Sequence, residues 1–383
     1  MFSRTDRSLL GVWWWTCDRT MLFLAFLLLV GGMLMVMAAS PPVATRLGFE
    51  ETHFVLRHGL FAITAFFVML AVSMLNDSMV RVIGIFGLLA LLVLIGLVLV
   101  FGSEANGARR WLSIAGFGIQ PSEFAKPCFA ITTAWLLSMW RVEPGFHGWL
   151  YALLVLAVIA GMLLAQPDIG MTIIFVMTWA VLMFLAGLPK GQVATLTLSA
   201  PALAYVAYNV FPHVTLRVDQ FLSGGNSQSA IARASFSEGG WLGVGLANGE
   251  VKKTLPDAHA DFIFAVVGEE YGGLIAVMVL AIYAYMALRA LHFAQLATSL
   301  FRMLAISGLA VQFGLQVAIH TASAVQLIPT KGMTLPFISY GGSSMLATSM
   351  TLGFIIALTR PTKHDQQGHS GSLPIHDRRR VSV

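Results

Sequence analysis

The stretch Leu255–Tyr271 contains the residues of this chain best suited to chemistry. Asp261 follows a long polar loop and directly precedes the apolar run Phe262–Val267. An ionisable side chain close to a bilayer is costly, so it usually has a function. Asp261 is therefore our candidate for the group that does chemistry. An aspartate before an apolar run is also a typical helix N-cap, and the two roles do not exclude each other.

Other ionisable residues in this stretch extend the candidate site. Asp257, His259 and Asp261 alternate, so an extended backbone would align them, although three such residues make a ligand-poor metal site. Glu269 and Glu270 interrupt the apolar run, and the residues from Tyr271 onward are long enough to span a bilayer almost alone. We expect both glutamates near the outer interface. In a continuous helix, Asp261 would lie about 12 Å further out than Glu269.

A second cluster precedes the predicted helix that begins near Pro121. Glu123 and Lys126 are three residues apart and share a helix face, which also fits a simple interfacial ion pair. Arg110 could form a bidentate contact with a phosphate group. Asp168, directly before another apolar run, is expected to cap a helix.

The third cluster lies in Leu327–Ser344, where prolines and glycines interrupt the apolar pattern around Lys331 and Ser339. Irregular backbone at membrane depth is tolerated only where protein or a wet cavity satisfies its polar groups. The segment therefore predicts a cavity lining beside a buried lysine. A purely structural re-entrant turn is the alternative.

The composition places these clusters in a membrane protein. Hydrophobic residues make up 57% of the chain and charged residues only 11%, with a mean hydropathy of +0.79. Soluble domains are about a quarter charged. No basic stretch is interleaved with aromatic residues, which argues against nucleic-acid binding, and a disulfide between Cys17 and Cys128 is implausible. Ten apolar runs predict an all-α bundle of ten spans, at about 21–39, 55–75, 82–101, 123–140, 148–165, 169–187, 193–211, 268–288, 303–325 and 342–359.

An even number of spans puts both termini on one side, and the larger share of loop Lys and Arg places that side in the cytoplasm. We therefore expect a cytoplasmic segment 1–20, a membrane domain 21–360 with a large extracytoplasmic loop 212–261, and a disordered cytoplasmic tail 361–383. The opposite face is also rich in Lys and Arg. Positive charge kept there suggests that this face binds an anion.

The motifs, taken in order, resemble the SEDS family (shape, elongation, division and sporulation). The resemblance covers about residues 12–360 and rests on Gly107–Trp111, Gln120–Lys126, Gln166–Asp168, Leu255–Phe264 with Gly268–Glu270, and Pro329–Ser344. Asp18-Arg19 and Ala39–Ala44 fit the division-site branch better than the elongation branch. The chain departs from the family pattern at Ala260, usually threonine, and at His320, often asparagine.

This resemblance implies a ten-span peptidoglycan glycosyltransferase in the bacterial inner membrane at the division septum. It would polymerise the undecaprenyl-linked precursor lipid II on the outer face, with a class B penicillin-binding transpeptidase and other division proteins as partners. The family's essential aspartate matches Asp261, which we expect to act as general base. The remaining site residues implied are Arg110, Glu123, Lys126, Lys331 and Ser339 for substrate, with His259, Glu269, Glu270 and Asp168 in support.

No organic cofactor is implied, whereas a divalent cation, Mg²⁺ or Mn²⁺, is plausible on the substrate diphosphate. The residues supply no firm ligand set for it. Two other functions fit the sequence. A lipid II flippase or transporter would also need a polar cavity between helices, and a division scaffold without catalysis would need only the membrane bundle and its partners.

Overall fold

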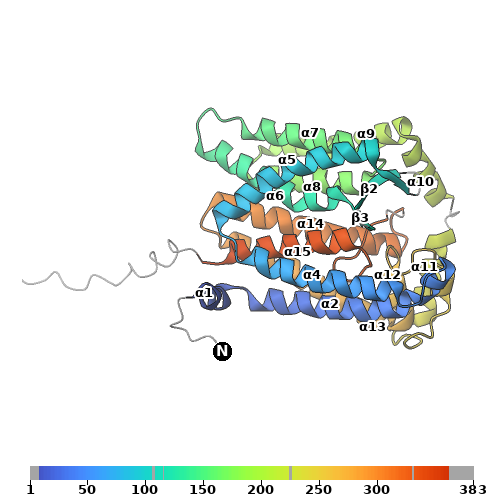
Figure 1. The fold of residues 1–383 in the computed structure, drawn as a ribbon. Coiled ribbons are helices and arrows are strands. Elements are labelled where there is room, and N and C mark those ends of the chain that lie inside the picture. The colour runs from blue at the N-terminus through green and yellow to red at the C-terminus, as the bar shows by residue number, and fades with distance from the viewer. Residues whose placement is uncertain (1–7, 106–107, 115, 224–226, 330–331, 362–383) are drawn as a thin grey trace, which may run out of the picture.

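The computed structural model describes residues 8–105, 108–114, 116–223, 227–329 and 332–361. It is a bundle of long helices with a small three-stranded antiparallel sheet at one end (Figure 1). In chain order the elements are α1 Leu9–Thr16, α2 Arg19–Ala39, α3 Pro41–Arg46, α4 His53–Ser73, α5 Asp77–Phe101, β1 Ser103–Ala105, β2 Ala108–Ile114, β3 Phe117–Ile119, α6 Pro121–Val142, α7 Gly148–Ala165, α8 Ile169–Leu185, α9 Lys190–Val210, α10 Pro212–Leu222, α11 Ser227–Gly239, the 3₁₀ helix η1 Val251–Lys253, α12 Ile263–Glu270, α13 Gly272–Gln295, α14 Leu300–Ala324 and α15 Gly342–Thr359.

Each of the ten predicted apolar runs coincides with a helix. Within the described residues, the helices that are long and apolar enough to cross a membrane number seven: α2, α4, α5, α7, α13, α14 and α15. Of the other three, α8 is apolar but only 17 residues long, α6 carries Glu123 and Lys126 in its first turns, and α9 contains two threonines, a serine and a proline. The chain is therefore a multi-pass helical membrane protein.

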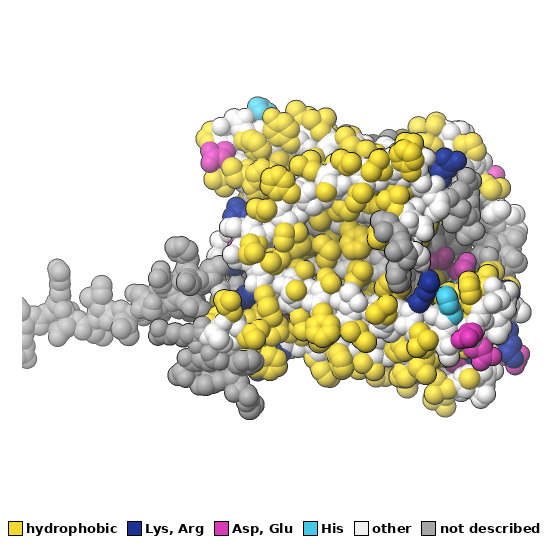
Figure 2. Space-filling model, viewed as in Figure 1, with side chains coloured by type: hydrophobic (Ala, Val, Ile, Leu, Met, Phe, Trp, Pro, Cys, Tyr) yellow, Lys and Arg dark blue, Asp and Glu magenta, His cyan; other side chains and the backbone are white. Residues whose placement is uncertain are grey.

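The charged side chains lie at the two ends of the bundle, and the belt between them is apolar (Figure 2). The sheet, α10 and α11 lie at one end, here called the hairpin end, and α1 lies at the other, the α1 end (Figure 1). Arg360, which follows α15, donates from Nε to Thr16 of α1 at 3.1 Å. The two ends of the described chain therefore meet at the α1 end.

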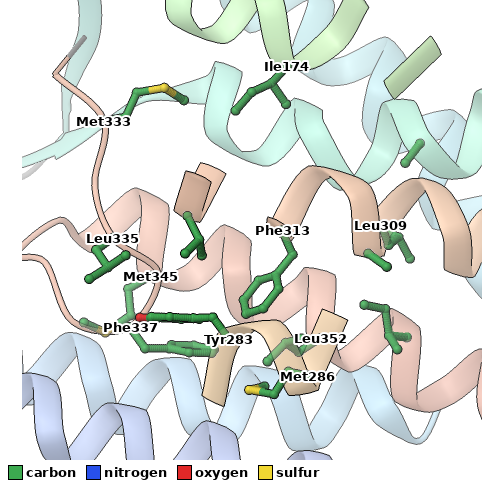
Figure 3. Packing of buried hydrophobic residues seen from close by; sticks show 14 of the residues in the cluster. Ile174, Tyr283, Met286, Leu309, Phe313, Met333, Leu335, Phe337, Met345 and Leu352 are labelled. Atoms are coloured by element: carbon green, nitrogen blue, oxygen red, sulfur yellow. The ribbon is translucent and has the colours of Figure 1, made fainter. Parts of the chain in front are cut away.

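The centre of the bundle is formed by α6, α14 and α15, whose residues are buried on nearly every side. Figure 3 shows how Phe313 of α14 and Leu352 of α15 pack around Tyr283 and Met286 of α13. A helix enclosed by other helices can carry polar residues where a lipid-facing helix cannot. This explains why α6, α14 and α15 together hold more than half of the buried polar side chains among the described residues.

The helix ends follow local capping rules. Asp168 caps α8, with its Oδ1 accepting from the backbone N–H of Met171 at 3.2 Å, as predicted. Asp18 caps α2 through Thr20 and Met21. The predicted N-cap role of Asp261 is wrong, because α12 begins at Ile263 and has Phe262, with no side-chain cap, at its N-cap position.

The prediction of one continuous helix running inward from Asp261 is also wrong. The chain breaks between α12 and α13 at Gly272, which has φ +84° and lies against the backbone of Trp241 and Gly243. A Cβ there would collide with that backbone, and a positive φ disfavours other residues. Glu269 and Glu270 thus end a short buried helix, and the 12 Å estimate does not apply.

Charge pairs fasten the α1 end. Arg289 of α13 forms two bonds to Asp18, at 2.7 and 3.1 Å. Arg302 of α14 forms two bonds to Asp77, the first residue of α5, at 2.6 and 2.9 Å. Paired hydrogen bonds between a guanidinium and a carboxylate are among the stronger polar contacts in proteins. They fix how far α5 and α14 slide past each other.

We expect Asp77→Asn to lower the free energy of unfolding by about 2 kcal/mol, because a buried guanidinium loses an ionised partner. Thermal unfolding in detergent measures this. The control is Glu250→Gln, which removes the charge of an exposed pair with Lys253 and should change stability by less than about 0.5 kcal/mol. Equal stability of Asp77→Asn and the parent would show that the Arg302 pair does not hold α14.

Candidate active site

The candidate site at the hairpin end is built from two segments far apart in sequence, Leu255–Phe262 and Gly332–Ser344. The N–H of Tyr340 donates to the carbonyl of His259 at 2.9 Å. Ser339 Oγ donates to the carbonyl of Ala260 at 2.7 Å and accepts from the N–H of Leu335 at the same distance. These bonds hold the two segments side by side around the residue that follows, Asp261.

Asp261 is partly exposed, and Gly332 lies directly over it. A Cβ at Gly332 would lie 3.3 Å from Asp261 Oδ2, and Gly332 has φ +60°. Glycine therefore both permits the turn and leaves room for the carboxylate. Lys331 precedes this glycine but lies outside the described residues. The structure thus places Asp261 at the contact of the two segments, where a solvent-borne or membrane-borne substrate can approach its exposed side.

His259 is buried within an aromatic cluster. Its ring lies 4.4 Å from that of Phe54 and 5.1 Å from that of Tyr340, measured between centroids. Burial lowers the pKa of His259 to about 4. Above about pH 5 this histidine is therefore neutral and acts as a packing residue beneath the segment that carries Asp261.

Arg57 of α4 also belongs to this cluster, and the sequence pattern did not single it out. Its side chain hydrogen-bonds to that of Tyr340. The only available signal was a cation near the start of an apolar helix, which is also typical of any membrane-edge residue. Asp257 is half-buried, which raises its pKa, while the nearby Arg46 opposes that shift.

The loop before Asp261 is fastened by two cations that sequence reasoning also missed. Lys252 is buried and pairs with Glu270, while its Nζ also donates to the carbonyl of Ala38 near the end of α2, at 2.9 Å. Its backbone N–H donates to Glu269 at 3.2 Å. Glu269 and Glu270 are thus supporting residues of a definite kind: they hold η1 against α12 and α2.

Arg46, which ends α3, reaches the same loop. Its guanidinium donates to the carbonyl of Leu255 at 3.2 Å and to that of Lys253. Carbonyls that leave regular secondary structure need a donor when water is partly excluded. Arg46 supplies one on each side of Thr254, so the loop enters the site along a fixed path.

Lys126 and Glu123 form a buried ion pair at 2.7 Å near the start of α6. Lys126 Nζ also donates to Gln316 Oε1 of α14 at 2.5 Å. The structure therefore pairs Lys126 with Glu123, the ion pair that their spacing fits, and with Gln316. Both charges are more than nine-tenths buried and present almost no surface to a ligand.

Gln316 is the hub that connects this pair to the Gly332–Ser344 segment. Its Nε2 donates to the carbonyl of Thr334 at 3.0 Å and to Ser344 Oγ at 3.1 Å. Thr334 in turn donates to Ser344 at 2.6 Å. His320, one turn further along α14, donates from Nδ1 to the carbonyl of Met333 at 2.6 Å. The polar groups of Met333, Thr334 and Ser344 in this segment thus find partners on α14 and α15.

The apolar side of the same segment fills the core. Leu335 and Phe337 point toward Tyr283 and Met345 (Figure 3). Phe337 has φ +64°, a region that favours glycine, and Tyr283 donates its hydroxyl proton to the carbonyl of the preceding Pro336. A backbone conformation of that kind persists only where the surroundings fix it. The segment is therefore held from both its polar and its apolar side.

Arg110 and Asp168 form a separate contact. Arg110, on β2, donates to the carbonyls of Gln166 and Pro167 at 3.2 and 2.7 Å and lies 3.5 Å from Asp168. This guanidinium anchors the sheet to the turn between α7 and α8. Its predicted phosphate contact would have to compete with three protein partners.

The described residues do not support a metal site. Across the described residues, no group of three or more His, Cys, Asp or Glu side chains is arranged to hold an ion. What the site offers chemically is one partly exposed carboxylate, a neutral histidine beneath it, and a cation hydrogen-bonded to a tyrosine of the same cluster.

The fold and site together define a multi-pass membrane protein with a rigid polar site at one end of its bundle. A model of the FtsW, RodA and SpoVE family, described as "Cell cycle protein", matches residues 18–364. The chain belongs to this family, which confirms the resemblance inferred from the motifs.

Curated relatives carry the name probable peptidoglycan glycosyltransferase FtsW. The protein of Caulobacter vibrioides is 40% identical over 97% of this chain and 96% of its own length. That of Aliivibrio salmonicida is 33% identical over 89% of this chain and 88% of its own.

Two solved structures share the fold. One is a chain from a study of the structural coordination of polymerization and crosslinking by a peptidoglycan synthase complex, with a TM-score of 0.75, 27% identity, and coverage of 90% of this chain and 97% of that chain. The other is the rod shape determining protein RodA of Thermus thermophilus, with a TM-score of 0.68, 26% identity and the same coverage.

The hub role of Gln316 leads to a prediction. Gln316→Met keeps the volume and removes the hydrogen bonds to Thr334, Ser344 and Lys126. The Gly332–Ser344 segment should be destabilised locally by about 2 kcal/mol, which corresponds to roughly thirtyfold faster amide exchange. Hydrogen-exchange mass spectrometry measures it. The exposed Gln192, replaced in the same way, is the control. If amide exchange of the segment were unchanged in Gln316→Met, the hydrogen bonds of Gln316 would not be what stabilises it.

Burial of His259 gives the stability a pH dependence. Its pKa of about 4 in the folded state lies below the usual 6.5, so the unfolded chain binds more protons between these values. Stability is full above about pH 6.5 and falls on acidification, by up to about 2 kcal/mol at pH 5 from this group. His259→Phe keeps a ring in the cluster and should flatten this slope. Thermal unfolding of both proteins from pH 4.5 to 8 tests it; parallel curves would contradict the assignment.

Proposed function

We propose that this protein is a peptidoglycan glycosyltransferase that polymerises lipid II into glycan strands during septal wall synthesis, with Asp261 as general base. The observation that carries the proposal is the placement of Asp261, partly exposed between two segments that are fastened by Ser339, Tyr340 and Gln316. A carboxylate on so rigid a support suits proton abstraction, which depends on geometry first. The names of the full-length relatives supply the activity.

In the proposed step, the 4-hydroxyl oxygen of the acceptor's terminal GlcNAc attacks C1 of the donor sugar. The bond between C1 and the lipid diphosphate oxygen breaks, and the hydroxyl proton passes to Asp261. The departing diphosphate gains charge, which nearby cations stabilise. Lys331, adjacent in sequence to the glycine over Asp261, is our first candidate for this role, with Arg110 as a second.

The buried residues take positioning roles in this proposal. Glu123 and Lys126 set the place of Gln316, and Ser339 ties the Gly332–Ser344 segment to Ala260. Their effect on substrate is then indirect, through the shape of the site around Asp261. A divalent cation, Mg²⁺ or Mn²⁺, would be carried by the substrate diphosphate, since the described residues offer no three-ligand cluster for it.

The proposed topology has ten spans, α2, α4 to α9 and α13 to α15, with 212–261 as the large extracytoplasmic loop. The hairpin end then faces the extracytoplasmic side, and both termini, with the segments 1–20 and 361–383, face the cytoplasm. Residues 362–383 lie outside the described residues. The meeting of Thr16 and Arg360 at the α1 end supports termini on one side.

The proposed partners are lipid II, a class B penicillin-binding transpeptidase of the FtsI type and other division proteins of the inner membrane. The resemblance to a chain from a peptidoglycan synthase complex that coordinates polymerization with crosslinking supports the transpeptidase.

We expect Asp261→Asn to form no glycan polymer from lipid II when purified with its transpeptidase partner, with a loss of at least about 100-fold, because the amide cannot accept the proton. Gel analysis of labelled product measures it. Asp219→Asn, at an exposed position on α10, is the matched control and should polymerise at the parental rate.

Polymer from Asp261→Asn at a rate near that of the parent would end the general-base proposal. The two rival functions give different results in the same preparation. A flippase would scramble labelled lipid II across vesicles without forming polymer. A scaffold would support division and recruit partners equally well with Asp261→Asn in place.

A further inference from the structure

Helix α1 is too short to span a membrane, although its Trp13 packs into the core. Its eight residues extend about 12 Å, far short of a bilayer. Cys17 and Asp18 are in extended conformations between α1 and α2, so the chain turns sharply there. Figure 1 shows α1 lying across the end of the bundle, whereas α2 runs along it.

One side of α1 is fixed to the bundle. The indole of Trp13 is buried and donates to Ser73 Oγ, at the end of α4, at 2.9 Å. Thr16 accepts a hydrogen bond from Arg360, after the end of α15. These contacts give α1 a definite orientation, so the direction of its other side is set by the fold.

Most of the remaining surface of α1 is apolar and exposed. Leu9 is 91% exposed, Leu10 50% and Val12 45%, and Trp14 and Trp15 are exposed beside them. Apolar residues of this size at the edge of an apolar belt need a cover other than water. Paired tryptophans at the end of a helical bundle are typical of the membrane–water interface, where an apolar ring with one polar N–H is stable.

A cation completes the surface. The guanidinium of Arg19 lies 5.0 Å from the ring centre of Trp14 and 4.8 Å from that of Trp15, and its Nε donates to the carbonyl of Trp14 at 3.3 Å. Arg19 itself is exposed. It is therefore held over the two indoles at an exposed position, where a phosphate can accept hydrogen bonds from its guanidinium.

We propose that α1 is an interfacial helix: Leu9, Leu10, Val12 and the two tryptophans enter the boundary between headgroups and acyl chains, and Arg19 binds the phosphate of an anionic lipid. The occupant is lipid, because the exposed residues of α1 are apolar, include two tryptophans and lie beside one exposed cation, Arg19. α1 then joins the membrane surface to the ends of α4 and α15, both of which contribute to the candidate site at the opposite end.

The test measures the depth of a nitroxide attached at Leu9→Cys or Leu10→Cys, in full-length protein carrying Cys17→Ala and Cys128→Ala, reconstituted in phosphatidylcholine with phosphatidylglycerol. Glu143→Cys, exposed in a loop at the α1 end, is the aqueous reference, and Phe67→Cys, exposed on α4, is the acyl reference. The ratio of collision rates with oxygen and with a nickel chelate should be several-fold higher at positions 9 and 10 than at position 143. It should also be lower at positions 9 and 10 than at position 67. A ratio equal to that at 143 would overturn the proposal.

The role of Arg19 is tested separately by varying the lipid. The label at position 10 should lie deeper in vesicles with phosphatidylglycerol than in phosphatidylcholine alone, and Arg19→Gln should abolish that difference. Arg81→Gln, at the same end, is the control and should retain it. A lipid dependence that persists in Arg19→Gln would refute the phosphate site and leave only an apolar contact.

Discussion

The structure depends on one constraint: backbone that is neither helix nor sheet must find hydrogen-bond partners inside the bundle. The Gly332–Ser344 segment runs irregularly between α14 and α15, where no bulk water can satisfy it. Gln316 and His320 on α14, with Ser344 on α15, supply the partners. Their polarity in turn requires that α6 and α14 be enclosed by other helices. The central position of these two helices thus follows from the segment that they support.

Buried charged side chains, like buried backbone, need partners inside the bundle. Lys126 is 5% exposed and Lys252 3%. Lys126 is paired with Glu123, and Lys252 with Glu270. Such a pair need not add stability, but removing one member leaves an uncompensated charge in an apolar interior. Both pairs lie beside segments that lead to Asp261. The cost of misplacing either charge therefore keeps those segments in one conformation.

Sequence patterns predicted the helices well because each is a long apolar run whose length is set by the bilayer. They failed at Gly272, where a contact with Trp241 and Gly243 breaks an otherwise good helix, since a contact between distant residues leaves no periodic signal. They placed Asp261, His259 and Ser339 in one site through the motifs and paired Lys126 with Glu123, but they did not reveal the contact of Lys126 with Gln316. Which cation meets which acceptor depends on side-chain positions in three dimensions, and Arg46, Arg57 and Lys252 emerged only there.

Helix α14 bears contacts at both of its ends. Arg302 fixes it to α5 at the α1 end, and Gln316, fourteen positions later, lies about 21 Å along the same axis. A helix of this length moves as a stiff rod. A rotation by a single residue, about 100°, would withdraw Gln316 from Thr334, Ser344 and Lys126 at once. A rotation or shift of α14 would therefore disturb the support of Asp261 without any contact with the carboxylate itself.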